Sequence, residues 1–193
     1  MNLHSIMKTV SDHVPRMESV WFSLPEDAFC ALRDAADYRE QLQLFRTRCC
    51  KFDDGDSQRA AIVLEFMYQT VHFCIKDCQM TYFQAQKYMS IVVDIFEKYC
   101  LTESAMEQTK EDALKEFGEK LQGIIYDHEV ISGDENAETR EERKNIVFSI
   151  DITRKMASYF SFSFIRYYDA YKFCFTTFPN FKDVNIVKNV ELR

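Results

Sequence analysis

The segment from Ile150 to Phe178 carries more aromatic rings than any other stretch of this 193-residue sequence. When the segment is read as a helix, the rings recur at steps of three and four residues and fall on one face. The positions on that face are Phe160, Phe164, Tyr167, Tyr171, Phe175 and Phe178, and Tyr159, Phe162 and Tyr168 widen it. Because each large ring buries on the order of 150–250 Å² when it is covered, such a face needs a surface to pack against. The spacing therefore predicts a long aromatic-rich helix at the centre of an all-α domain.

Two alternatives remain open for this segment. The run from Tyr159 to Phe164 alternates aromatic rings with serines, as a β-strand would, although charges at helical spacing on both sides favour the helix. The segment also resembles a calmodulin target, in which an amphipathic helix places aromatic anchors in an apolar groove. From Arg154 onward the segment contains one acidic residue, Asp169, and four basic residues. The basic residues are Arg154, Lys155, Arg166 and Lys172. A core helix and a partner-binding helix share this pattern.

The composition favours helices and protein partners. Hydrophobic residues make up 47% of the chain, enough for a core, whereas only four glycines and three prolines are present. An all-β fold of this length needs more turn-forming residues. The net charge of −7 gives no basic surface for nucleic acid or anionic lipid. We therefore expect a single helical domain of five or six helices, with no nucleic-acid or membrane partner.

The seven cysteines are expected to be free thiols. The first twenty residues contain charges and histidines and lack the apolar stretch of a signal peptide. No uncharged run reaches the roughly 18–20 residues that a membrane-spanning helix needs. An odd number of cysteines in such a chain indicates a reducing compartment. The expected location is the cytoplasm.

No motif in the sequence assembles a catalytic or metal site. Cys74 and Cys78 lie one helical turn apart and would supply two corners of a zinc site, but no second compact pair accompanies them. The aspartates around Gly55 lack the remaining ligands of an EF-hand loop. None of the histidines stands in a triad or elbow pattern; they are His4, His13, His72 and His128. We expect a non-enzymatic protein with no cofactor, metal or small-molecule substrate.

Capping signals divide the rest of the chain into helices. Ser23 and Glu26 form a capping-box pattern that predicts a helix running to about Lys51. Its inward side would consist of Phe29, Leu32, Ala36, Leu42 and Phe45.

Three further helices are expected before the acid-rich stretch. Asp56 caps a helix that reaches Cys78, and Thr81 with Gln84 opens the next by a second capping-box pattern. A more polar helix then starts at Thr102 or Ser104 and passes over Phe117 and Leu121.

The predicted organisation is one domain with an arm and a tail. Residues 1–24 form an N-terminal arm that Trp21 and Phe22 anchor to the body. The helical domain spans residues 25–178 and includes an acidic loop at 127–144. Residues 179–193 form a C-terminal tail without a predicted place in the fold.

Three blocks of the sequence carry a family resemblance. The first is Asp56-Ser57-Gln58-Arg59 and the helix after it; the second is the helix from Phe83 to Phe96. The third and most specific combines Tyr159-Phe160, Phe164-Ile165-Arg166-Tyr167-Tyr168 and Tyr171-Lys172-Phe173. Over about residues 56 to 178 the chain resembles the CLAMP-type family of flagellar central-pair projection subunits and their short vertebrate relatives. It departs from the family at Cys78 to Tyr82, where relatives have an aromatic-Pro-Trp sequence, and in a longer acidic insert.

The resemblance implies an all-α, non-enzymatic subunit of the ciliary or flagellar axoneme, part of the cytoskeleton. Its partners would be other subunits of a central-pair projection, with calmodulin as a further candidate because the family's complex is associated with calmodulin. We expect the chain to act by covering apolar helix faces against its neighbours. The interface residues we name are Arg166, Tyr167, Tyr168 and Tyr171. The alternative is a cytosolic helical adaptor or calmodulin-binding module not tied to cilia.

Overall fold

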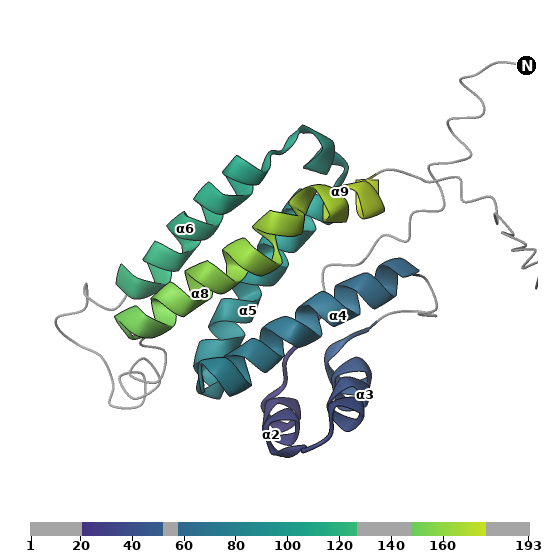
Figure 1. Ribbon diagram of the computed structural model, residues 1–193, viewed down its shortest axis with the longest axis vertical. Coiled ribbons are helices and arrows are strands. Elements are labelled where there is room, and N and C mark those ends of the chain that lie inside the picture. The colour runs from purple at the N-terminus through teal and green to yellow at the C-terminus, as the bar shows by residue number, and fades with distance from the viewer. Residues whose placement is uncertain (1–20, 52–57, 127–147, 177–193) are drawn as a thin grey trace, which may run out of the picture.

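The computed structural model of the protein describes residues 21–51, 58–126 and 148–176, and these are built from helices (Figure 1). The α-helices are α2 (Glu26–Asp34), α3 (Tyr38–Cys49), α4 (Gln58–His72), α5 (Tyr82–Phe96), α6 (Lys110–Tyr126), α8 (Ile150–Ser163) and α9 (Tyr168–Thr176). Short π-helical turns follow α4 at Phe73–Asp77 and α5 at Glu97–Leu101. Within these three ranges there is no β-strand, and the predicted all-α class is confirmed.

Helix α5 lies in the middle of the arrangement. On one side of it α6 and α8 run next to each other, and α4 crosses on the other side with α2 and α3 beneath it (Figure 1). The side chains of α5 explain this position, because they are apolar on more than one face; Ala85, Tyr88, Met89, Ile91, Val92, Ile95 and Phe96 are all buried. A helix that is apolar around most of its circumference must be covered from several sides.

The predicted capping box at the start of α5 is confirmed. The Thr81 side chain accepts from the Gln84 backbone N–H, and the Gln84 side chain accepts from the Thr81 backbone N–H. The reversal that precedes it passes through Gln79, whose φ of 50° lies in the left-handed region. The Met80 N–H then donates to the Cys74 carbonyl at 2.9 Å and closes the turn. These contacts fix the angle between α4 and α5.

The single helix expected from Ser23 to Lys51 is wrong, because the chain is extended between α2 and α3. Helix α2 begins after Pro25, which makes no side-chain cap, and α3 begins after Asp37. The Asp37 carboxylate accepts from the backbone N–H groups of Arg39 and Glu40 and stabilises the new start. Ala36, expected to point inward, is exposed between the two helices.

The polar helix also starts later than predicted. Thr102 precedes a 3₁₀ helix at Glu103–Glu107, and α6 begins only at Lys110. Its true cap is reciprocal: the Asp112 N–H donates to Thr109 Oγ1 at 3.1 Å, and the Thr109 N–H donates to Asp112 Oδ2 at 3.2 Å.

The long C-terminal helix is divided, which corrects the prediction of one continuous element. Helix α8 ends at Ser163, a 3₁₀ turn covers Ile165–Tyr167, and α9 follows. The hydroxyls of Ser161 and Ser163 donate to carbonyls four residues earlier, a pattern that bends and weakens a helix. The same serines suggested a strand, and that alternative is wrong because Tyr159 to Ser163 lies within α8.

The start of the chain that the structure describes is held in the body, as expected for Trp21. The Trp21 side chain is buried, and Phe22 forms an isolated antiparallel bridge with Cys50. The Lys51 N–H donates to the Trp21 carbonyl and the Ser23 N–H to the Cys49 carbonyl. Several predictions concern residues that lie outside the described ranges. They are those on residues 1–20, the cap at Asp56, the acidic stretch 127–144, the helix end at Pro179 and the tail 179–193.

Two general properties bear on function. In the portion shown by the structure, no helix combines the length and apolarity that crossing a bilayer requires. The described side chains also bring no three His, Cys, Asp or Glu residues together in a group that could hold a metal ion.

Candidate interface on the C-terminal helices

Tyr168 and Tyr171, two of the four predicted interface residues, lie on the core side of α9. Tyr168 is 2% exposed, and its hydroxyl donates to the Gln108 carbonyl. The Tyr171 ring is half-buried and stacks on Phe164 with ring centroids 5.8 Å apart. Both side chains therefore hold α9 against the body of the protein.

Arg166 and Tyr167 lie on the solvent side of the same segment. They belong to the 3₁₀ turn between α8 and α9. Tyr167 is 46% exposed, so its predicted place on the inward aromatic face is wrong. The ring of Phe162, one helical turn earlier, is 61% exposed. The Arg166 guanidinium carbon lies 5.0 Å from the centre of the Phe162 ring and 5.7 Å from that of Tyr167. We call Phe162, Arg166 and Tyr167 the outer aromatic cluster.

Helix geometry explains why Phe162 points outward although its neighbours point inward. Successive residues of an α-helix are 100° apart, so a residue two positions from Phe160 and two from Phe164 projects from the opposite side. Phe160 and Phe164 are 1% and 0% exposed. The 3₁₀ turn then carries Arg166 and Tyr167 past the edge of the core. The expectation that Phe162 widens the inward aromatic face is therefore wrong, and its two-residue spacing from Phe160 and Phe164 would have placed it outward.

The charges of this segment set the cluster apart from the rest of the chain. Residues 148–176 contain four basic and two acidic residues, whereas the full chain carries a net charge of −7. Lys155 pairs with Asp151 at 3.5 Å, and the Lys172 ammonium donates to the carbonyls of Met106 and Gln108. Among the carboxylates that the structure describes, none lies within 4.0 Å of Arg166. Arg166 is therefore a cation held by rings and without a described acidic partner.

Four of the cysteines in the described part of the chain are buried free thiols whose pKa values are raised. Cys74 and Cys78 are buried, and burial raises the pKa of the Cys78 thiol to about 11 and that of Cys74 well above its ordinary value. Burial likewise raises the pKa of Cys49 and of Cys100 to about 12. A thiol with such a pKa stays protonated near neutral pH and is a poor nucleophile.

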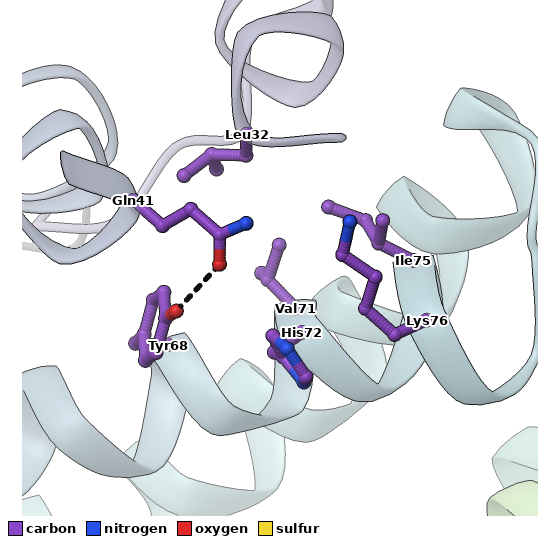
Figure 2. Close-up of a pocket in the computed structure, with 7 residues that line it drawn as sticks. All are labelled: Leu32, Gln41, Tyr68, Val71, His72, Ile75 and Lys76. Atoms are coloured by element: carbon purple, nitrogen blue, oxygen red, sulfur yellow. Dashed lines mark hydrogen bonds between the residues drawn. The ribbon is translucent and has the colours of Figure 1, made fainter. Parts of the chain in front are cut away.

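A small hollow lies between α3 and the end of α4, and Figure 2 shows the side chains that line it. The Tyr68 hydroxyl donates to the Gln41 side-chain oxygen at 2.9 Å, and the Gln41 amide donates to the Ala35 carbonyl. Lys76 extends along the rim and donates to the Arg33 carbonyl. The space left holds roughly one water molecule, far less than a substrate requires. The hydrogen bonds of the hollow thus join α3 to α4.

The described part of the chain is all-α, and the outer aromatic cluster lies exposed at the break between α8 and α9. The model of the CLAMP family, described as flagellar C1a complex subunit C1a-32, matches residues 69–182, more than half of the chain. The chain belongs to this family, which confirms the resemblance seen in the sequence and indicates a protein of the ciliary or flagellar axoneme. No curated protein and no solved structure gives a significant match.

Proposed function

We propose that this protein is a non-enzymatic structural subunit of the C1a projection on the central pair of the ciliary or flagellar axoneme. It joins neighbouring subunits through the outer aromatic cluster. The assignment to the C1a projection is supported by membership of a family of flagellar C1a complex subunits. The observation that carries the contact is the Arg166 guanidinium, which lies close to the exposed rings of both Phe162 and Tyr167.

The composition and shape of this cluster suit a protein interface. Arginine and aromatic residues are the side chains most enriched among those that dominate binding energy. The rings also limit the rotamers of Arg166, so less side-chain entropy is lost when a partner binds. We place the helical domain at residues 25–178, with Trp21 and Leu24 packed into its core.

The core packing also bears on calmodulin as a partner. A calmodulin target inserts its aromatic anchors into the apolar groove of calmodulin. In this protein the rings of Phe160 and Phe164 are already buried against Phe117 and Phe66. Binding through these anchors would require α8 to leave the core. We therefore infer that the folded domain does not bind calmodulin through these rings; a titration of the folded protein with calcium-loaded calmodulin tests this inference.

The assembly is tested by locating the protein in flagella. The chain is tagged in a flagellated cell, the membrane is removed with detergent, and the axoneme is separated from the soluble fraction. We expect retention on the axoneme and loss of retention in cells that lack central-pair microtubules. Retention without that dependence would contradict the C1a assignment, and complete release would favour the cytosolic adaptor.

The role of the cluster is tested by a matched pair of substitutions. Phe162→Ala removes an exposed ring of the cluster, and Leu114→Ala removes an exposed apolar side chain of α6, where Leu114 is 43% exposed. We expect Phe162→Ala to reduce retention and Leu114→Ala to leave it unchanged, with both proteins folded by circular dichroism. Equal retention of both variants would place the contact elsewhere on the protein.

A further inference from the structure

Arg166 is prepared to bind an anionic group. Its guanidinium lies near two aromatic rings, at 5.0 Å from the Phe162 centroid and 5.7 Å from the Tyr167 centroid. Rings that cover a guanidinium favour the cation and hold its plane, while the N–H donors at its edge remain available. These donors match a carboxylate, with which arginine forms two parallel hydrogen bonds. In the described residues no carboxylate takes this place.

Neither of the two acidic residues in the segment that contains α8 and α9 forms an ion pair with Arg166. Asp169 is exposed three residues later, yet no ion pair joins it to Arg166. The other acid of the segment, Asp151, pairs with Lys155. Arg154 is also exposed and has no described ion pair, which adds a second positive charge to α8. Residues 148–176, with four basic and two acidic side chains, thus carry a net charge of +2 on a protein whose total charge is −7.

We propose that the partner covering the outer aromatic cluster is an acidic protein segment that presents an Asp or Glu carboxylate to Arg166. Apolar side chains next to that carboxylate pack on the rings of Phe162 and Tyr167. This inference rests on the proposed function, because it names the chemistry of the partner at the same surface. Charge complementarity selects this occupant: an acidic segment pairs with Arg166, whereas a basic or purely apolar one leaves it unpaired when covered.

The proposal is tested by a zero-length cross-link on isolated axonemes. Carbodiimide joins a lysine amine to a carboxylate in contact with it and does not react with arginine in this way. Axonemes containing Arg166→Lys are compared with axonemes containing the wild-type chain, which is the matched control. We expect a new amide bond at position 166, absent from the wild type, to an Asp or Glu of another axonemal protein. Mass spectrometry of the digested product identifies that residue.

Three results would overturn the proposal. One is the absence of a cross-link at position 166 in axonemes whose other lysines react. A second is a cross-link to the chain's own residues 127–147, seven of which are Asp or Glu, within the same molecule. The third is a cross-link to that segment in a second copy of the chain. Axonemes that contain both tagged and untagged chains distinguish a cross-link between two copies from one within a single molecule.

Substitutions that remove or reverse the charge at position 166 then test the carboxylate proposal separately from the C1a assignment. Arg166→Met should weaken axoneme binding at least about tenfold, seen as release at lower salt. Arg166→Glu should abolish retention, and replacing the identified carboxylate by arginine should restore it. If the wild-type chain is retained but Arg166→Glu is retained equally well, the carboxylate proposal fails while the C1a assignment stands. If the wild-type chain is not retained, the assignment itself fails.

Discussion

Phe117 and Phe160 stack face to face, with ring centroids 3.9 Å apart and ring planes 3° from parallel. Phe117 belongs to α6 and Phe160 to α8, so this pair joins the two helices that lie next to each other in Figure 1. Both side chains are almost completely buried, at 2% and 1% exposure. The contact fixes which side of α8 faces the core and thereby which side presents Phe162 to solvent.

Replacing Phe160 by alanine should destabilise the domain strongly, whereas the same change at Phe162 should not. Phe160→Ala leaves a cavity between α6 and α8, and such changes cost about 3–5 kcal/mol of unfolding free energy. Phe162→Ala removes an exposed ring and one cation–π contact, which contributes about 0.5–1 kcal/mol. Urea unfolding followed by circular dichroism measures both. Similar losses at the two positions would contradict the assigned faces of α8.

The hydrogen bond between Tyr68 and Gln41 should matter more than that between Tyr38 and Glu65. Tyr68→Phe leaves the buried Gln41 oxygen without its donor, and an unsatisfied buried acceptor costs about 1–3 kcal/mol. Tyr38→Phe removes a bond of 3.3 Å at the exposed surface and should change stability by less than about 0.5 kcal/mol. Thermal unfolding of the two variants tests the difference. Equal small losses would show that the Gln41 oxygen finds another donor.

Much of the fold could be predicted from the sequence where local and tertiary signals agree. The capping box at Thr81 and the apolar face of α5 both specify the same helix, and both are confirmed. The inward positions Phe160 and Phe164 followed from helical spacing alone. Family membership was also visible in the sequence, and the family model confirms it over residues 69–182.

The helix breaks could not be predicted from periodicity. Between α2 and α3 the chain turns because α2 packs against α5 while α3 packs against α4. The two alanines at positions 35–36 favour a helix and do not predict a break that tertiary packing imposes. At Ser163 the 3₁₀ turn changes the helical phase by only a fraction of a turn, so the three-and-four spacing continues across it. Of the four residues named for an interface, Arg166 and Tyr167 are exposed, Tyr168 is buried and Tyr171 is half-buried.

Replacing Gly118 by alanine should stabilise the isolated domain. Gly118 lies in the middle of α6, and an added Cβ would meet no atom within 4 Å. Glycine inside a helix is less favourable than alanine by about 0.5–1 kcal/mol, because it loses more backbone entropy on folding. We expect Gly118→Ala to raise the unfolding free energy by up to that amount in urea titrations. Ala113→Gly, at a fully buried position of the same helix, should lower it. A loss of stability in Gly118→Ala would show that this face of α6 is covered.

Glu97 and Glu116 should give opposite pH dependences, because their pKa values shift in opposite directions. The pKa of Glu97 is raised, because burial disfavours the ionised carboxylate. The hydrogen bond that the Trp21 indole donates acts to lower this pKa but does not outweigh burial. The pKa of Glu116 is lowered: burial acts to raise it, but hydrogen bonds from Lys98 and Tyr99 outweigh that effect. A raised pKa means that folding holds the proton more tightly, so this contribution to stability is lost as the pH rises through the folded pKa of Glu97. For Glu116 the contribution is present above the unfolded pKa and is lost as the pH falls.

Replacing each acid by glutamine isolates these contributions. Glu97→Gln keeps an oxygen that accepts from Trp21 and cannot ionise, so its stability at pH 7.5 should match or exceed that of the wild type, by less than about 1 kcal/mol. Glu116→Gln loses two charge-assisted hydrogen bonds and should lower stability at pH 7.5 by about 1–2 kcal/mol. At pH values below the lowered folded pKa of Glu116 both variants should approach the wild type. Trp21 is the sole tryptophan, so its fluorescence during urea unfolding reports directly on the Glu97 contact. A marked loss of stability in Glu97→Gln at pH 7.5 would mean that the ionised carboxylate is required to hold Trp21 in the core.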